Sequence, residues 1–324
     1  MNMEISLLKK GLVLWIIFLF IGAGVIPVIG GNVVEKDSNY LLSNGNTLYV
    51  GGSGPGNYTS IQDAIDDASD GDTVFVYDDS SPYYENPSID KSINLIGENR
   101  NTTIIYDNAC GSLVYIRADW VTVSRFTISG TGACSFGIRA WYSDHCTITD
   151  NMISNIGITG LSITGDSNII TNNILTNNDC AINLYGFSNN IMGNTITSDI
   201  SHGYKDSGIN IQSSRLNIIK GNNILNQEIG IKLESCHWTT ITGNTISENE
   251  LGMLLDDDTQ GNIIQKNNFL DNERNAAFHH SFLNRWMQNY WGKPRIFPKL
   301  IFGHILFIPW IQVDWRPAKE PFDI

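Results

Sequence analysis

The sequence predicts an all-β protein whose chain coils into a right-handed parallel β-helix, a solenoid with ~22 residues per turn. The first observation is a six-residue segment, such as ITGNTI (241–246), that recurs with asparagine at its fourth position. Successive asparagines are 22, 21, 28, 22, 23 and 22 residues apart. The second observation is an apolar–x–apolar triplet that follows most copies, as in Gly230-Ile231-Lys232-Leu233. Each repeat therefore holds two short strands separated by turns, too closely spaced for long helices. The seven asparagines are Asn151, Asn173, Asn194, Asn222, Asn244, Asn267 and Asn289.

There is a physical reason for repeating asparagine at a bend. Asparagine tolerates the left-handed backbone conformation that a sharp bend between strands needs. Its amide is both donor and acceptor, so residues stacked ~4.8 Å apart form a ladder of hydrogen bonds along the axis. The 28-residue interval predicts an extra loop at Ser198–Asp206. A weaker second column is expected at the other turn: Asn168, Asn189, Asn217, Asn262 and Asn284.

The N-terminal region is typical of an exported protein. In residues 1–31, Lys9 and Lys10 precede an uncharged apolar stretch that runs to Gly31. This pattern indicates a secretory signal peptide, although the stretch is long enough to remain as a membrane anchor. The body is exported in either case, and contact with a membrane is expected only through this segment. Residues 32–46 are a polar linker.

Residues 47–292 form the predicted solenoid with an N-terminal cap. Ile61, Ala64, Ile65 and Ala68 have helical spacing after Ser60, which predicts an amphipathic helix that covers the first turn. Residues 293–324 leave the repeat and are expected to form an irregular C-terminal cap, with a membrane-proximal or envelope-docking role as the alternative. The aromatic residues expected to bury that cap are Phe297, Phe302, Phe307, Trp310 and Trp315.

Composition narrows the choice of partners. The 324 residues include 20 Lys plus Arg and 33 Asp plus Glu, for a net charge of −13. This balance argues against nucleic acid, and it makes an acidic polysaccharide an unfavourable ligand unless cations intervene. The five cysteines form no CxxC motif, so buried thiols, at least one of them unpaired, are expected rather than a zinc site.

The opening YTSIQDAIDDASDGDTVFV, followed by INLIGE and IxGNxI repeats, resembles the right-handed parallel β-helix superfamily of exported proteins. It is most similar to the NosD-like, carbohydrate-binding and sugar-hydrolase branch common among archaeal surface proteins, over residues 47–292. The resemblance implies the fold but no single activity, because the superfamily includes lyases, esterases, glycosidases, epimerases and adhesins. Catalytic motifs of these enzymes do not carry over; Asn194-Thr195, for example, continues with Ile196 instead of aspartate. The NosD likeness also implies copper delivery, but His145 and His237 are four turns apart and cannot share an ion.

One surface column is the candidate site. It consists of the residues that follow the second strand of each repeat: Trp141, Thr164, Tyr185, Gln212, Glu234, Asp256 and His279. Glu234 and Asp256 are a candidate carboxylate pair for a retaining glycosidase. With Asp257 and Asp258, Asp256 is a candidate Ca²⁺ site, and a solvated acidic turn is the alternative to both.

Exposed aromatic residues suggest carbohydrate binding. Trp141 and Tyr185, with Trp238 on the adjacent turn, are candidates for stacking on sugar rings, although they could equally cover turn backbone. The sequence is thus interpreted as an exported, cell-surface β-helix that binds a polysaccharide or cell-envelope glycan without cleaving it. No cofactor is required, and Ca²⁺ is the candidate ion. The alternatives are a polysaccharide lyase or glycoside hydrolase and, less favoured, a NosD-like copper-delivery protein.

Overall fold

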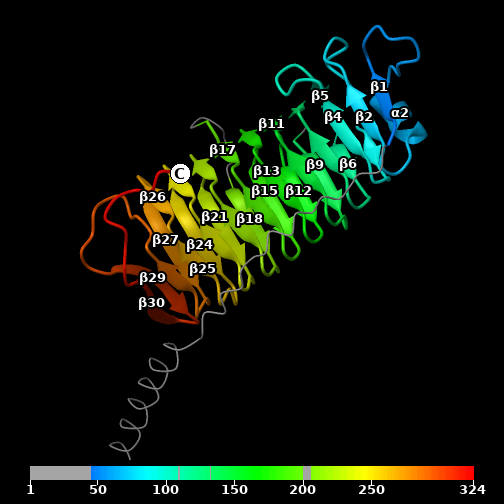
Figure 1. Ribbon diagram of the computed structural model, residues 1–324. Coiled ribbons are helices and arrows are strands. Elements are labelled where there is room, and N and C mark those ends of the chain that lie inside the picture. Colours follow the sequence, from blue (N-terminus) through cyan, green and yellow to red (C-terminus); the bar gives the residue numbers. More distant parts are fainter. Residues whose placement is uncertain (1–44, 109, 132, 200–205) are drawn as a thin grey trace, which may run out of the picture. The chain divides into compact units, whose positions relative to one another are not determined.

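The structure is a computed structural model that describes residues 45–108, 110–131, 133–199 and 206–324 (Figure 1). Within them the chain forms the predicted right-handed parallel β-helix, in which each central turn contributes a strand to each of three faces. The predicted targeting segment 1–31, nearly all of the linker 32–46 and most of the loop Ser198–Asp206 lie outside the described residues. No helix in the described part of the chain is long and apolar enough to span a membrane.

The first face contains the longest strands of the solenoid, and we call it the long-strand face. Neighbouring strands pair in parallel, with one turn of chain between partners, as Ile231 pairs with Met253. Its strands are β3 (Ser88–Ile89), β6 (Gly111–Ile116), β9 (Ser135–Trp141), β12 (Thr159–Thr164), β15 (Cys180–Tyr185), β18 (Ser207–Gln212), β21 (Ile229–Glu234), β24 (Leu251–Asp256), β27 (Arg274–His279) and β29 (Lys299–Ile305).

The other two faces contain mostly three-residue strands whose central side chain points into the core. The second face contains β1 (Thr47–Val50), β2 (Thr73–Val76), β4 (Asn94–Gly97), β7 (Thr122–Ser124), β10 (Thr147–Thr149), β13 (Ile169–Thr171), β16 (Asn190–Met192), β19 (Ile218–Lys220), β22 (Thr240–Thr242), β25 (Ile263–Gln265), β28 (Arg285–Met287) and β30 (Ile308–Asp314). The third face contains β5 (Ile104–Tyr106), β8 (Thr127–Ser129), β11 (Met152–Ser154), β14 (Ile174–Thr176), β17 (Thr195–Thr197), β20 (Asn223–Leu225), β23 (Thr245–Ser247) and β26 (Asn268–Leu270).

The seven repeated asparagines form a continuous ladder at the corner between the second and third faces, which we call the asparagine corner. Each Nδ2 donates to the Oδ1 of the asparagine one turn further along, over 2.8 to 3.1 Å. The ladder ends where Asn289 Nδ2 donates to Asp314 Oδ2 at 3.2 Å. All seven side chains are buried. Because every amide has partners both above and below, the buried polar column is stabilising rather than costly.

One expectation about this corner is wrong. The left-handed backbone conformation belongs to the residue before each asparagine, not to the asparagine itself. Gly193, Gly221 and Gly243 occupy that position in three successive turns, with φ of 63°, 65° and 63°. Glycine adopts this conformation without strain, which explains the glycine of the IxGNxI repeat. The asparagine is needed for its amide instead.

Two further columns of amides line the other turns. The expected second column is present: Asn168 N donates to Asn189 Oδ1 at 2.8 Å, and Asn262 Nδ2 donates to Asn284 Oδ1 at 2.9 Å. The third column, which the sequence analysis missed, includes Asn249, whose Nδ2 donates to Asn272 Oδ1 at 2.9 Å. Side-chain amides therefore satisfy backbone groups at all three corners.

The N-terminal cap is the predicted amphipathic helix, α2 (Ile61–Asp67). Ser60 caps it, accepting a hydrogen bond from Asp63 N, and the carboxylate of Glu85 accepts from Ile61 N and Gln62 N. These contacts satisfy the free N–H groups of the first helical turn. Ile61, Ala64 and Ile65 are fully buried against the first turn of the solenoid.

The C-terminal cap is more regular than expected. β29 and β30 form an antiparallel hairpin that extends the long-strand and second faces. Alternation along the hairpin turns Ile301, Gln312 and Asp314 inward, where they are buried. The five aromatic residues expected to be buried are instead exposed: Phe297, Phe302, Phe307, Trp310 and Trp315.

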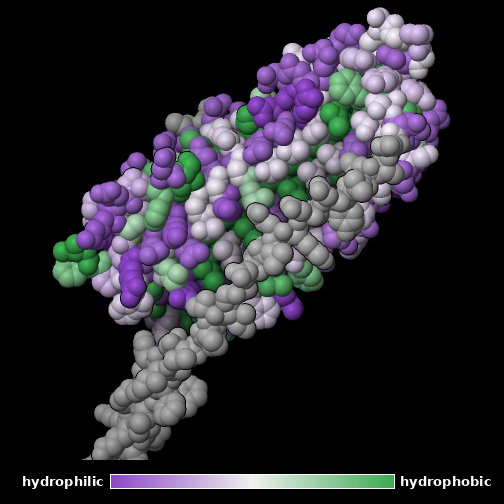
Figure 2. All heavy atoms as spheres, viewed as in Figure 1, coloured by the Kyte–Doolittle hydropathy of each residue, from purple (hydrophilic) through white to green (hydrophobic). Residues whose placement is uncertain are grey.

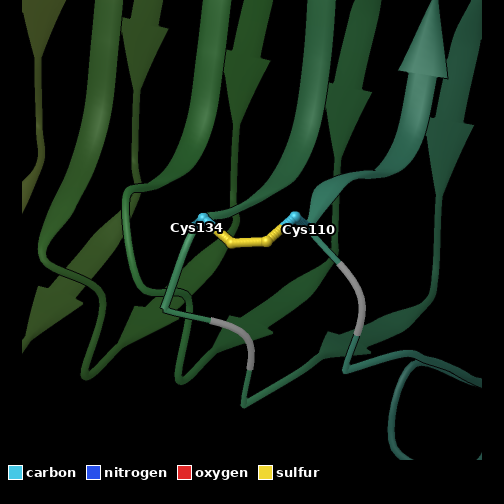
Figure 3. The surroundings of a disulfide bond; sticks show 2 residues. All are labelled: Cys110 and Cys134. Carbon is cyan, nitrogen blue, oxygen red and sulfur yellow. A yellow bond between two sulfur atoms is a disulfide. The ribbon is translucent and has the colours of Figure 1, made fainter.

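The cysteines divide into two groups. Cys110 and Cys134 form a disulfide just before β6 and β9, so it links two neighbouring turns (Figure 3). Cys146, Cys180 and Cys236 are free and buried. Burial raises the pKa of Cys146 and of Cys236 to about 11 and raises the pKa of Cys180 as well. These three thiols are therefore protonated and unreactive at neutral pH.

Candidate functional site

Two rows of outward side chains run along the long-strand face, and we call them together the long-strand strip. Strand pairing places the members of each row in register, one turn apart. The outer row is the column expected from the sequence, so that register prediction is confirmed; its members are Trp141, Thr164, Tyr185, Gln212, Glu234, Asp256 and His279. The inner row, not singled out from the sequence, is Tyr115, Arg139, Ser162, Asn183, Asn210 and Lys232.

One end of the strip is aromatic and cationic. The guanidinium carbon of Arg139 lies 4.4 Å from the ring centroid of Trp141, 4.9 Å from that of Phe136 and 6.0 Å from that of Tyr115. Arg117 lies 5.7 Å from the same Tyr115 ring. These contacts hold the guanidinium planes against aromatic faces. Arg139 Nε is buried without a hydrogen-bond partner, and no carboxylate in the described part of the chain forms an ion pair with either arginine.

The middle of the strip presents amides and hydroxyl groups. Asn210 Nδ2 donates to Asn183 Oδ1 at 3.2 Å, and the Tyr185 hydroxyl donates to Gln212 Oε1. The Asn210 Oδ1 atom is buried without a partner. These groups can both donate to and accept from a polar ligand along the strip.

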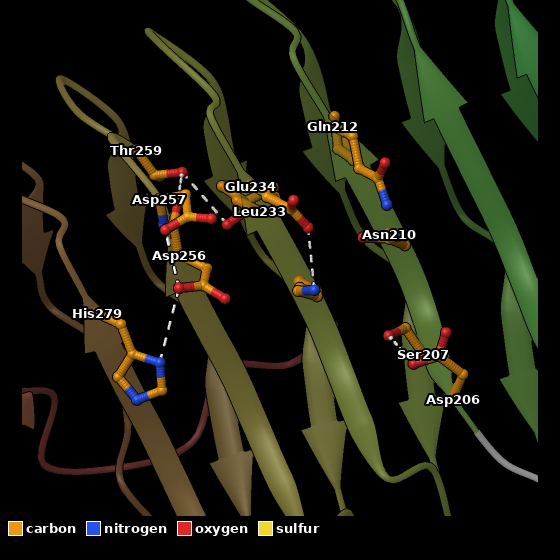
Figure 4. A network of polar contacts seen from close by, with 12 residues as sticks. Asp206, Ser207, Asn210, Gln212, Leu233, Glu234, Asp256, Asp257, Thr259 and His279 are labelled. Atoms are coloured by element: carbon orange, nitrogen blue, oxygen red, sulfur yellow. Dashed lines mark hydrogen bonds and ion pairs between the residues drawn. The ribbon is translucent and has the colours of Figure 1, made fainter.

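The other end is charged (Figure 4). Lys232 Nζ lies 3.0 Å from Glu234 Oε2, and His279 Nδ1 lies 3.6 Å from Asp256 Oδ1. Burial opposes the charge on Lys232, but the hydrogen bond and charge of Glu234 outweigh it and raise the pKa of the lysine. Burial lowers the pKa of His279, and the charge of Asp256 opposes this effect.

The proposed carboxylate pair is brought together, since Glu234 and Asp256 are register partners on β21 and β24. Each has its own cationic or imidazole partner, and the two carboxylates form no hydrogen bond with each other among the contacts of the described residues. A glycosidase pair needs one carboxyl that holds a proton to donate and one that is ionised. The arrangement seen here supplies two neighbouring carboxyl groups, one paired with Lys232 and the other with His279.

The structure does not assemble the proposed Ca²⁺ site. Asp256 pairs with His279, Asp257 Oδ1 lies 3.5 Å from His280 Nδ1, and Asp258 Oδ1 accepts from Gln260 Nε2. Among the residues that the structure describes, no group of three or more His, Cys, Asp or Glu side chains could hold a metal ion. Each of the three carboxylates thus has a different partner.

A histidine cluster emerges that the sequence analysis missed, because His304 comes from the C-terminal hairpin. The ring of His304 lies 4.5 Å from that of His279, tilted by 31°, and 5.2 Å edge-to-face from that of His280. Such packing brings ring faces and edges together rather than converging nitrogens on one point. His145 instead stacks on Trp120 at 4.1 Å. The described residues therefore do not fit a histidine-based copper site.

Trp238 is not part of the long-strand strip. It lies on the turn after β21, four residues beyond Glu234, and is exposed. The other two candidate aromatics, Trp141 and Tyr185, are in the strip with Thr164 between them. The geometry thus separates the candidate sugar-binding residues into two in-line rings and one outlier.

Solved structures of other proteins share the fold of this chain, and a family model matches its sequence. The chain is similar to tailspike protein 2 from Escherichia coli O157:H7 bacteriophage CAB120, with 14% identity over 77% of this chain and 38% of the tailspike, at a TM-score of 0.56. It is also similar to an alginate lyase from Paenibacillus sp. str. FPU-7, with 12% identity over 74% of this chain and 95% of the lyase, at a TM-score of 0.53. No curated protein matches significantly. At such identities the likeness shows the shared β-helix alone.

The family comparison covers most of the solenoid. Residues 65–296 match the family described as periplasmic copper-binding protein (NosD). The matched range begins within α2 and ends beyond the last asparagine of the corner. The chain therefore belongs to the NosD family.

Proposed function

We propose that the solenoid binds a polysaccharide chain lengthwise along the long-strand strip without cleaving it. The observation that carries this proposal is the alignment of Trp141 and Tyr185 in one column, each about 40% exposed, with polar groups between and beside them. Parallel strands place equivalent side chains ~4.8 Å apart, so the strip offers regularly spaced contacts to a polymer of similar units. Aromatic faces pack on the C–H faces of sugars, while the amides of Asn183, Asn210 and Gln212 pair with hydroxyl groups.

The arginine pair supports a tighter hold on the polymer at the aromatic end of the strip. Among the residues that the structure describes, no carboxylate forms an ion pair with Arg117 or Arg139, although the net charge of the chain is −13. Their N–H groups are donors for sugar hydroxyls or carboxylates, and a carboxylate would neutralise the two neighbouring positive charges. The negative net charge of the chain disfavours an acidic polysaccharide. The two arginines, however, supply positive charge on the strip itself, where such a ligand would bind. The predicted targeting segment 1–31 would deliver the protein to the cell envelope, where such glycans occur.

A polysaccharide lyase or hydrolase is the second candidate, favoured by the contiguity of Glu234, Asp256 and His279 at the charged end. Copper binding, which the family description names, and the copper delivery considered from the sequence are not proposed, because no group of three or more His, Cys, Asp or Glu side chains among the described residues could hold a metal ion.

Binding and cleavage can be separated in one set of measurements. Isothermal titration against neutral and uronate-containing polysaccharides gives affinity, and assays for reducing ends and unsaturated uronates on the same samples give turnover. Trp141→Ala and Tyr185→Ala are each expected to weaken binding about tenfold, the effect of losing one stacked ring. Trp238→Ala is the matched control, since its indole is exposed but off the strip, and its affinity should not change.

Three results would contradict this function: unchanged affinity in both strip variants, equal loss in Trp238→Ala, or no binding to any glycan. Turnover abolished by Glu234→Gln would replace the binding function with the enzymatic one.

A further inference from the structure

The C-terminal hairpin carries an apolar surface that the solenoid does not bury. We call it the hairpin patch: Phe302, Leu306, Phe307, Ile308, Trp310 and Ile311, all exposed and Phe307 completely so. Figure 2 shows apolar atoms projecting where Figure 1 has the loop that leads into β29, at the same end of the solenoid as the hairpin. Large exposed apolar side chains gathered on one protruding hairpin mark an interaction surface. Phe302 and Ile311 are on one side of the hairpin, and Ile308 and Trp310 are on the other side, near the tip.

The patch is a consequence of how the hairpin pairs. Phe302 is paired with Ile311, and alternation turns both away from the last solenoid turn while their neighbours Ile301 and Gln312 face it. The tip is also apolar, since Leu306 and Phe307 connect the two strands. Leu306 adopts the left-handed conformation, with φ of 54°, at a position where glycine or asparagine is the usual choice. The hairpin thus ends in a protruding apolar edge instead of a polar turn.

The segment that carries the patch has a charge opposite to that of the whole chain, with its cations before and at the base of the hairpin. Between residues 293 and 313 there are three cations, Lys293, Arg295 and Lys299, and neither aspartate nor glutamate, whereas the net charge of the chain is −13. The three are close enough to affect one another: burial first, and then the charges of Arg295 and Lys293, lower the pKa of Lys299. The surface therefore fits an anionic partner.

The apolar residues and the three cations together indicate whether the hairpin patch binds a bilayer or a second copy of the chain. Two copies joined symmetrically through the patch would place the same three cations against one another, which is unfavourable. A bilayer that contains anionic lipids accepts both features, because apolar and aromatic side chains enter the interfacial region while lysine and arginine meet the headgroups. We propose that the C-terminal hairpin docks this end of the solenoid on the surface of an anionic bilayer, independently of the predicted N-terminal segment and of glycan binding.

The test needs a local probe, because the predicted N-terminal segment could itself bind lipid. In the full-length chain, Phe307→Cys is labelled with an environment-sensitive fluorophore; the native free thiols are buried and do not compete. Phosphatidylcholine vesicles with phosphatidylserine are expected to shift the emission to the blue, and vesicles without it to leave the emission nearly unchanged. Raising the salt concentration should reverse the shift. Label at Leu216→Cys, an exposed leucine on a solenoid turn at least three turns away from the hairpin, should not respond.

Charge variants sharpen the test. Replacing Lys293, Arg295 and Lys299 together with glutamine should raise the lipid concentration for half-maximal shift at least about tenfold. The matched control removes the same charge from three exposed solenoid cations, Arg215, Lys220 and Lys266, and should have little effect.

Four results would overturn the proposal. They are no shift with anionic vesicles, an equal shift with neutral ones, an equal response at residue 216, or a lipid-free shift that grows with protein concentration. The last would assign the patch to a second copy.

Discussion

The asparagine corner and the long-strand strip are built on the same turns with the same spacing, yet one repeats a single residue and the other varies. At the corner, every turn poses the same problem: a buried bend whose backbone groups need partners, which one amide per turn supplies. On the strip the backbone is already satisfied by strand pairing, so side chains are free to differ from turn to turn. In this molecule, a residue repeated on every turn therefore indicates a role in stability, and positions that differ from turn to turn indicate the candidate site.

The largest effect on stability is expected behind the corner, in the core. Ile224→Ala empties a fully buried position next to the ladder and should lower the free energy of unfolding by roughly 2–5 kcal/mol. Chemical denaturation followed by circular dichroism measures the change. Ile169→Ala, which alters a half-exposed isoleucine on β13, is the control, and its free energy of unfolding should fall much less. Equal losses of unfolding free energy in the two variants would mean that burial of an isoleucine does not determine how much it contributes to stability.

The ladder itself is tested by Asn222→Ala. The change removes the acceptor of Asn194 N and the donor to Ile191 O, leaving buried groups unpaired at a cost of about 1–3 kcal/mol. Asn223→Ala alters the adjacent, exposed asparagine and is expected to be within about 0.5 kcal/mol of wild type. If Asn222→Ala melted at the wild-type temperature, the ladder would contribute nothing to stability.

The residue before the asparagine offers a prediction of the opposite sign. Lys266 holds a φ of 54° where three other turns have glycine, so Lys266→Gly should stabilise by about 1 kcal/mol. Gly243→Ala should destabilise by a similar amount; its φ is 63°, and the new Cβ meets no atom closer than 4.0 Å, so strain in the backbone is the only cause. Thermal melts of both variants check the pair. If both variants were stabilised, or both destabilised, the role assigned to the residue before the asparagine would be wrong.

The smallest stability effect is expected on the strip. Gln212→Ala removes the acceptor of the exposed Tyr185 hydroxyl but no buried partner, so the free energy of unfolding should change by less than about 0.5 kcal/mol. The same variant should weaken glycan binding in the titrations. If Gln212→Ala greatly lowered the free energy of unfolding, this part of the strip would have a structural role, and it would not differ from the asparagine corner in the way described.

The two ends of the solenoid show where prediction from sequence succeeds and fails. Ile61, Ala64 and Ile65 announce a helix by local spacing, and the helix packs as expected because its burial pattern is contained in its own sequence. The hairpin of β29 and β30 has apolar residues on both of its sides, so its sequence does not tell which side faces the last turn. The aromatic residues assigned to the core for their type alone, such as Phe307, are exposed.

The sequence by itself determined the coil, its period and the column in which Trp141, Tyr185, Glu234 and Asp256 lie, because a fixed spacing in a parallel solenoid translates directly into vertical register. Only the tertiary structure decided which neighbours those side chains meet: Arg139 between aromatic rings, Lys232 against Glu234, and His304 against His279. It also gave each of the three aspartates its own partner. The physical reason is that backbone pairing fixes where each residue lies, whereas the direction and partners of a side chain depend on residues distant in the chain.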